Sequence, residues 1–236
     1  MSIADNVAAI RAEIDRAAIA AGRNPNEILL CAATKMNDAD AVRQAIAAGV
    51  DCCGENRVQE LTRKLSENAY EGAPVHFIGH LQTNKVKQVV GKVDLIQSVD
   101  RIKLLECIDA EAEKLGIVQD ILLEINIGEE ESKSGFSIED ILPLLSNIRT
   151  YPNIRVRGLM AIPPICEKKG DNNKFFAEIC NLAVDIRQKK YDNVFMDFMS
   201  MGMSDDFSDA IACGSTMIRI GTAIFGARDY NKSHHP

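Results

Sequence analysis

Aromatic side chains and long apolar runs are both scarce in this chain of 236 residues. Trp is absent and aromatic residues make up 5% of the sequence, so the core must consist of aliphatic side chains. No segment is long and apolar enough to cross a bilayer. The first 21 residues include Asp5, Arg11 and Glu13, which interrupt the apolar stretch that a signal peptide requires. We therefore expect a soluble, intracellular protein located in the cytoplasm.

Basic residues are in the minority, since the formal net charge is −7. A protein with this balance binds nucleic acid only if its basic residues gather on one face. The basic clusters are Lys168-Lys169 and Lys189-Lys190, which we interpret as solvated surface. We expect no nucleic-acid partner and no membrane partner.

Paired cysteine motifs are also missing. No CxxC pair occurs, and most cysteines lie in apolar stretches, which favours reduced, buried thiols in the cytosol over disulfides or a zinc site. His76 and His80 have a spacing that suggests a metal site, but we expect no Asp, Glu or Cys nearby to complete a ligand set. We predict that no metal is bound and that His80 makes local hydrogen bonds. The cysteines are residues 31, 52, 53, 107, 166, 180 and 213.

Short apolar runs alternate with helical patterns along the whole chain after an amphipathic first helix. This alternation is typical of parallel βα units, and eight strands favour a closed (β/α)₈ barrel, the TIM barrel, with an additional N-terminal helix. We expect a single domain over residues 1–236. The predicted strands are 28–34, 51–54, 75–79, 94–98, 120–127, 155–162, 195–200 and 216–220. The predicted helices are 2–21, 38–48, 57–69, 83–91, 101–115, 138–149, 172–190 and 205–213.

Lys35 closes the apolar run of residues 28–34 and so follows the first predicted strand. Active sites of such barrels lie at the carboxyl ends of the strands. Desolvation of a lysine favours its neutral form, which is the nucleophile that forms a Schiff base with an aldehyde. The alternative is a lysine that only extends to solvent from a strand end.

Glycine and hydroxyl residues end the seventh and eighth predicted strands, in the segments 200–204 and 216–222. Glycine lets the backbone approach an anion closely, and hydroxyl and N–H groups donate hydrogen bonds to phosphate oxygens. In barrels of this type a phosphate is often bound after these two strands. Taken separately, each segment is also explained by a tight turn followed by a helix cap.

Arg219 lies inside an otherwise apolar strand, and alternation places it on the same face as Met217. One interpretation is an outward arginine that pairs with a carboxylate on a helix. The other is an arginine that faces the open end of the barrel, where a pyridine nitrogen would be a suitable acceptor.

Ordered motifs over nearly the whole chain resemble those of the pyridoxal phosphate homeostasis protein family, single-domain relatives of the N-terminal barrel of alanine racemases. The matching segments are Ala33-Thr-Lys35, residues 54–60, 76–82 with 84–85, 98–101, Asn126 with 131–135, 157–163, 200–207 and 219–226. Two positions depart from the family pattern. Asp38 stands where the family usually has Pro, and Val75 stands where it usually has Trp.

The resemblance implies that Lys35 binds pyridoxal 5'-phosphate as a Schiff base. It implies that the phosphate is surrounded by Ser200, Gly202, Gly221 and Thr222, and that Arg219 faces the pyridine nitrogen. It also implies that Asn56 and Met160 contact the ring. The loop of residues 126–135 is expected to be solvated, although Ser132, Lys133 and Ser134 could meet a ligand or partner.

Three functions are compatible with these patterns. The first is a cofactor carrier without robust catalytic activity, which takes part in vitamin B6 and amino-acid homeostasis and makes transient contact with apo pyridoxal phosphate enzymes. The second is an amino-acid racemase. Racemases of this type use a tyrosine from a second domain, and we expect none of Tyr70, Tyr151, Tyr191 and Tyr230 to replace it. The third is a phosphosugar enzyme that acts through Lys35. We favour the carrier, without catalytic residues, as a monomer.

Overall fold

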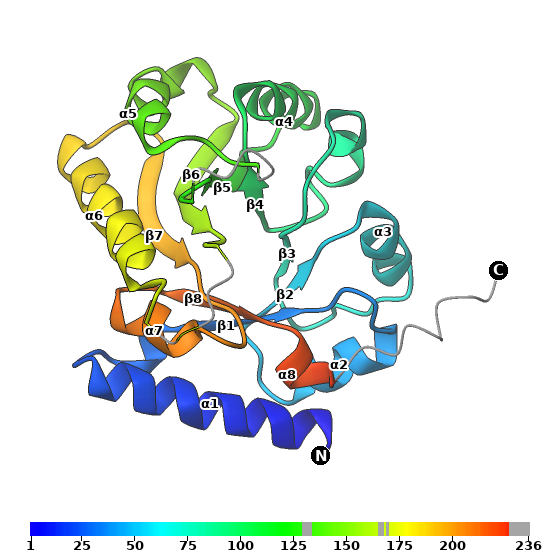
Figure 1. Cartoon of the computed structure of the whole chain (residues 1–236). Coiled ribbons are helices and arrows are strands. Elements are labelled where there is room, and N and C mark those ends of the chain that lie inside the picture. Colours follow the sequence, from blue (N-terminus) through cyan, green and yellow to red (C-terminus); the bar gives the residue numbers. More distant parts are fainter. Residues whose placement is uncertain (129–133, 165–167, 169, 227–236) are drawn as a thin grey trace.

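Eight parallel strands form a closed barrel in the order β1 to β8, with β8 pairing back onto β1, and helices surround the ring (Figure 1). This computed structural model describes residues 1–128, 134–164, 168 and 170–226. The predicted (β/α)₈ barrel is confirmed, and each predicted strand is present within two residues at either end. The strands are β1 Leu29–Ala33, β2 Cys52–Glu55, β3 Val75–Phe77, β4 Leu95–Val99, β5 Gln119–Ile125, β6 Ile154–Ala161, β7 Val194–Ser200 and β8 Met217–Ile220.

Alternation along the strands divides the buried residues into two sets. One set faces outward and packs under the helices, as Leu30, Ala32 and Cys53 do. The other set fills the inside of the barrel, where Cys31 and Met217 lie in one cluster. Two layers of packed side chains therefore hold the ring, and the interior is a core rather than a channel.

The helices agree with the predicted pattern except in the third connection, and the helices predicted over 57–69 and 138–149 each end three residues early. They are α1 Ile3–Ala20, α2 Ala39–Ala47, α3 Val58–Ser66, α4 Ile102–Leu115, α5 Ile138–Ser146, α6 Asn173–Lys189, α7 Phe207–Ala212 and α8 Thr222–Phe225. Three short 3₁₀ helices are η1 Pro25–Glu27, η2 Thr83–Gln88 and η3 Ile148–Thr150. The sequence patterns did not predict η1 or α8.

The α-helix predicted over 83–91 is wrong, because this segment forms η2 and two turns. It contains three valines, whose branched side chains lower helix propensity, and Gly91 with a φ of 70° ends it. The helix predicted over 138–149 is shorter than expected. The side chains of Ser146 and Asn147 bond to the carbonyl oxygen of Pro143, and the chain continues as η3.

The N-terminal helix α1 completes the ring of helices, because α8 has only four residues and cannot cover the β8–β1 side of the barrel. Its buried stripe of Val7, Ile10, Ile14 and Ala18 packs against α7, α8 and α2. Figure 1 shows α1 lying beneath β8 and β1. Within the described residues, none of the helices is long and apolar enough to span a bilayer.

Candidate functional site

Lys35 lies in the turn that follows β1, at the barrel end where the carboxyl ends of the strands meet, which we call the mouth. The turn needs an unusual backbone, since Met36 has a φ of 62°, and it is held by the Met36 N–H bonding to Glu60 Oε2 at 2.7 Å. The Asn37 side chain donates to the Lys35 carbonyl oxygen. Lys35 is half-buried. The sequence prediction of a lysine at this strand end is confirmed.

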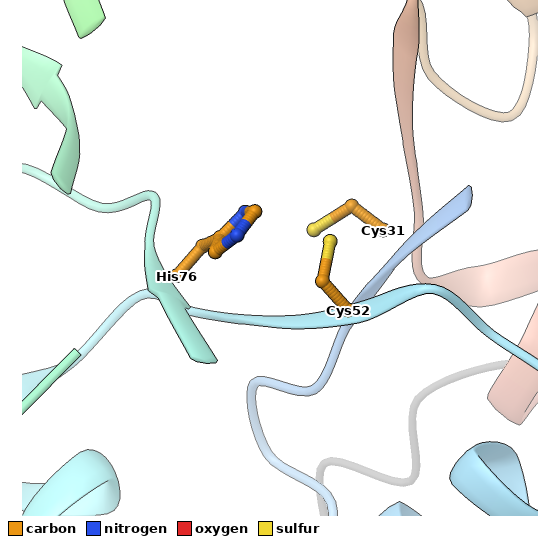
Figure 2. A group of neighbouring side chains, drawn as sticks. All are labelled: Cys31, Cys52 and His76. Carbon is orange, nitrogen blue, oxygen red and sulfur yellow. The ribbon is translucent and has the colours of Figure 1, made fainter. Parts of the chain in front are cut away.

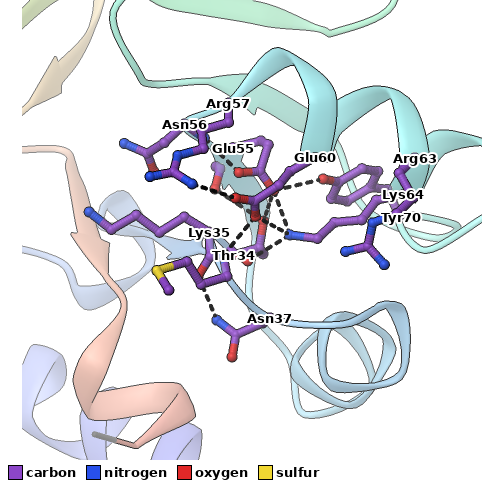
Figure 3. A network of polar contacts seen from close by, with 12 residues as sticks. Thr34, Lys35, Asn37, Glu55, Asn56, Arg57, Glu60, Arg63, Lys64 and Tyr70 are labelled. Atoms are coloured by element: carbon purple, nitrogen blue, oxygen red, sulfur yellow. Dashed lines mark hydrogen bonds and ion pairs between the residues drawn. The ribbon is translucent and has the colours of Figure 1, made fainter. Parts of the chain in front are cut away.

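A buried ion pair lies directly beneath this turn. Lys64 Nζ, which is fully buried, is 2.6 Å from Glu55 Oε2 and 2.7 Å from the carbonyl oxygen of Thr34. Thr34 and Tyr70 donate their hydroxyl groups to the same Glu55 oxygen. Figure 3 shows the Lys35 side chain extending away from this cluster. The chain around Lys35 is thus tied to β2 and α3.

Sequence reasoning missed both Glu55 and Lys64. A signal was present for Lys64, because it follows Val58 and Leu61 on the face of α3 that is buried against the barrel. A charge at such a position needs a buried partner. Burial is the largest cause that raises the pKa of the Tyr70 phenol above its usual value, and the nearby negative charge of Glu55 adds to it. Tyr70 therefore acts here as a neutral hydrogen-bond donor.

The ends of β7 and β8 provide a cradle of backbone atoms beside Lys35. Gly202 has a φ of 96°, and a Cβ added there would lie 2.7 Å from the Cβ of Ala210. A Cβ added at Gly221 would lie 3.4 Å from the carbonyl oxygen of Ala33, two residues before Lys35. Thr222 and Ala223 begin α8 and are exposed at the mouth, and the first N–H groups of a helix lack partners within it. These donors follow Gly221, which packs against Ala33.

Arg219 is buried inside the barrel, so the interpretation of an outward arginine is wrong. Its guanidinium donates to the carbonyl oxygen of Ser200 at 2.6 Å, to Ser200 Oγ at 2.7 Å and to the carbonyl oxygen of Ala161 at 3.0 Å. Burial lowers the pKa of Arg219. None of the ion pairs among the described residues includes it. The Ser200 hydroxyl also donates to Gln97 Oε1, so in this structure Ser200 positions Arg219.

Glu124 on β5 is an acidic residue that sequence reasoning missed. Desolvation by burial is the main reason that its pKa rises to about 7, and the nearby charge of Asp100 adds to the effect while Arg219 opposes it. It is the register partner of Met160 on β6, which in turn pairs with Ser200 on β7. The sequence signal that could have revealed Glu124 was a charged residue within the apolar run of β5. Glu124 places a proton that is exchangeable near neutral pH close to Arg219.

Asn56 and Met160 occupy different depths of the barrel. Asn56 follows β2 at the mouth, and its side-chain oxygen is buried without a hydrogen-bond partner among the described residues. Gly79 packs so closely on it that an added Cβ would lie 2.0 Å from the Asn56 carbonyl oxygen. Met160 is buried in the interior cluster. The unpaired oxygen of Asn56 is what a site for a polar ligand would leave when the ligand is absent.

The cysteines do not behave as one group. Cys31, Cys52 and Cys53 are buried, as predicted, whereas Cys107, Cys180 and Cys213 are only half-buried, and all six are free thiols. Cys166 lies outside the described residues. The expectation that no cysteine lies near His76 is wrong, because β1, β2 and β3 bring Cys31 and Cys52 to it. A hydrogen bond from Cys52 is the largest cause that lowers the pKa of Cys31 to about 6, and the same bond raises the pKa of Cys52.

His80 at the mouth is bonded to another element. Its Nδ1 lies 3.1 Å from Oδ2 of Asp100, the residue that directly follows β4. It also lies 3.4 Å from the hydroxyl of Ser134. The prediction of purely local bonds was therefore incomplete. Ser134 is exposed, and the interpretation of Ser132 and Lys133 falls outside the described residues. Tyr230 also lies outside them.

The closed barrel carries a lysine after its first strand, glycines at the ends of strands seven and eight, and a buried inward arginine. Its sequence places it in the alanine racemase N-terminal class. The family model described as alanine racemase, N-terminal domain, matches residues 5–229. The similarity is closer still within one branch of this class, and the chain belongs to the pyridoxal phosphate homeostasis protein family. The sequence-based recognition is confirmed.

Three relatives illustrate the match. The pyridoxal phosphate homeostasis protein of Aquifex aeolicus is 40% identical over 230 residues, which cover 98% of this chain and 100% of the relative. PipY of Synechococcus elongatus, solved with PLP bound, has a TM-score of 0.82 and 32% identity over 95% of this chain and 100% of its own. Alanine racemase of Streptomyces coelicolor shares the fold at a TM-score of 0.70 and 17% identity, over 97% of this chain and 59% of its own.

Proposed function

We propose that this protein binds pyridoxal 5'-phosphate through a Schiff base on Lys35 and buffers the cofactor in the cytoplasm, within vitamin B6 and amino-acid homeostasis. The observation that carries the proposal is the adjacency of Lys35 to the glycine-lined end of β8. Gly221 packs on Ala33, so an anion held by Gly221 and Thr222 would lie near the chain segment that carries Lys35. Pyridoxal phosphate carries its aldehyde and the methylene group of its phosphate ester on neighbouring ring atoms, which suits this arrangement.

The residues present fit the cofactor. The unpaired side-chain oxygen of Asn56 can accept a bond from a ligand at the mouth, and Met160 offers apolar contact below it. Gly202 and Gly221 keep the backbone open for the phosphate, while Ser200 holds Arg219 in place. When bound, the cofactor supplies an electrophilic aldehyde and a ring that can take up electron density.

Arg219 is the reason to favour a carrier over a racemase. A guanidinium is always protonated and has no acceptor atom, so it cannot keep the pyridine nitrogen protonated by accepting a bond from it. The ring is then a weak acceptor of electrons. The hydroxyl of Tyr70 is bonded to Glu55 on the outer side of β2, so this tyrosine does not serve as a base at the mouth. Transient contact with apo pyridoxal phosphate enzymes would complete the transfer of the cofactor.

The test is a visible absorption spectrum of the purified protein with pyridoxal phosphate, before and after borohydride reduction, followed by peptide mapping. We expect reduction to attach the cofactor to Lys35, and we expect Lys35→Ala to lose the attachment while it keeps the native circular dichroism spectrum. Lys85→Ala, which removes another half-buried lysine, is the matched control. Attachment elsewhere, or no band after the cofactor is added, would overturn the proposal and favour a phosphorylated carbonyl substrate. Rapid racemization of alanine would instead favour the racemase.

A further inference from the structure

A second group of reactive side chains lies inside the barrel, and the cofactor proposal does not use it. Cys31 comes from β1, Cys52 from β2 and His76 from β3, and their donor atoms all lie within 4.8 Å of one another. The three residues are 0%, 2% and 6% exposed. Figure 2 shows both sulfur atoms and the imidazole directed toward one another. Since Cys31 and Cys52 are register partners on paired strands, the backbone holds the two sulfur atoms together.

The donor set restricts the kind of ion that it can hold. Two thiolates and an imidazole are soft ligands that select Cu⁺ or Zn²⁺ over Mg²⁺ and Ca²⁺. Structural zinc requires four donors, but within the part of the chain that the structure describes no fourth His, Cys, Asp or Glu joins the group. The neighbours in the interior cluster are apolar, among them Leu95, Leu122 and Met217. A closed site with three soft donors is suited to a monovalent d¹⁰ ion, which accepts two or three ligands.

The local charges favour the same ion. Two thiolates with a monovalent cation carry one net negative charge, and Arg219, the register partner of Cys31, carries one positive charge. Arg219 is buried and takes part in none of the ion pairs among the described residues, although Glu124 and Asp206 lie close enough to interact with its charge. A divalent ion would form a neutral complex and add no negative charge near Arg219.

We propose that Cys31 Sγ, Cys52 Sγ and His76 Nε2 bind one monovalent d¹⁰ metal ion, Cu⁺. The two thiols lose their protons to solvent on binding, and no atom changes its oxidation state. His76 Nδ1 already faces the side-chain amide of Gln97 at 2.9 Å, which leaves Nε2 for the ion. Metal-bound histidines commonly use the other ring nitrogen to bond such a group.

The same amide links the ion site to the mouth. Gln97 Oε1 accepts a bond from the Ser200 hydroxyl at 2.6 Å, and Ser200 Oγ accepts one from Arg219. Ligation through Nε2 puts the imidazole proton on Nδ1, so the amide oxygen of Gln97 must turn to accept it. The amide nitrogen then faces Ser200, whose hydroxyl loses its acceptor and must reorient beside Arg219. Cu⁺ should therefore perturb ligand binding at the mouth.

The experiment is an anaerobic titration of the reduced full-length protein with Cu⁺ held by a chromophoric chelator, with native mass spectrometry to count bound ions. A second sample is expressed in copper-supplemented medium, because a closed site can be loaded during folding. We expect one Cu⁺ per chain. Cys31→Ser, Cys52→Ser and His76→Gln should each weaken binding by about two orders of magnitude.

Cys53→Ser is the matched control, because Cys53 is equally buried on the same strand but faces outward. It should bind Cu⁺ as the wild type does. X-ray absorption of the wild-type complex needs no variant and should show two sulfur neighbours and one nitrogen. Any of four results would overturn the proposal: no bound ion in either sample, equal loss in Cys53→Ser, binding of Zn²⁺ but not Cu⁺, or a Cys31–Cys52 disulfide in place of a metal.

Discussion

Gly202 meets two constraints at the end of β7 that a larger residue would violate. Its φ of 96° is unfavourable for residues with a Cβ, and the added atom would lie 2.7 Å from Ala210 Cβ and 3.0 Å from Phe207 Cα. We predict that Gly202→Ala lowers the free energy of unfolding by about 3 kcal/mol, from backbone strain and overpacking together. Urea denaturation measures the change.

Gly49→Ala separates the two causes. Gly49 also has a φ of 96°, but nothing lies within 4 Å of its added Cβ. The free energy of unfolding of this variant should fall by only about 1 to 2 kcal/mol, because the substitution introduces the backbone strain without the steric clash. Equal losses in the two variants would show that close packing at Gly202 is unimportant.

Glu124 should make the stability of the protein without cofactor depend on pH. Its folded pKa of about 7 lies above the ordinary value of 4.5, so the folded state keeps a proton that the unfolded chain has released. The stabilising contribution is complete below pH 4.5 and is lost as the pH rises to about 7. We predict that Glu124→Gln is more stable than the wild type at pH 8, by roughly 2 kcal/mol. The effect is measured by thermal unfolding of both proteins between about pH 5 and pH 8, the range in which this contribution is lost. Parallel pH profiles would contradict the prediction.

At the scale of elements, the contact between β2 and α3 depends on the buried pair of Glu55 and Lys64. Both side chains are fully buried and 2.6 Å apart, so removal of one leaves the other charged without its partner. We predict that Lys64→Met costs about 3 to 5 kcal/mol in urea denaturation. The double variant Glu55→Gln with Lys64→Met should regain part of that loss, because neither buried charge remains.

Lys103→Met is the control for a charge pair that water reaches. Lys103 and Glu106 are exposed on α4 at 3.4 Å, and the variant should change the stability by no more than about 0.5 kcal/mol. A similar small effect for Lys64→Met would mean that the buried pair does not hold α3 to the barrel.

Element prediction succeeded where one local pattern dominates. The strands follow from apolar runs of four to eight residues bounded by polar segments, which few alternatives explain. The segment 83–91 failed because its apolar spacing fits a helix, whereas its valines and Gly91 favour tighter turns. The helix α8 is too short to give a periodic pattern. Gly221 and Thr222 at its start were singled out from the sequence only as part of a predicted phosphate site.

At the scale of the whole molecule, we predict one cooperative unfolding transition for a single domain and a monomer in solution. The two layers of core residues run around the whole ring, and α1 joins the first part of the chain to α7 and α8. Unfolding by circular dichroism and by intrinsic tyrosine fluorescence should coincide. Light scattering should report a mass of 25.9 kDa. Separate transitions, or twice that mass, would contradict the prediction.

The sequence by itself determined where the strands lie along the chain and that Lys35 follows the first of them, because these features depend on local periodicity. It left open whether Arg219 points into the barrel or outward. The tertiary structure alone decided which way Arg219 points and which distant residues meet. Cys31, Cys52 and His76 come together only when β1, β2 and β3 pair in register. Lys64 reaches Glu55 only when α3 packs on the barrel. Such contacts depend on strand register and ring closure, which involve the whole chain at once. Short sequence patterns therefore do not predict them.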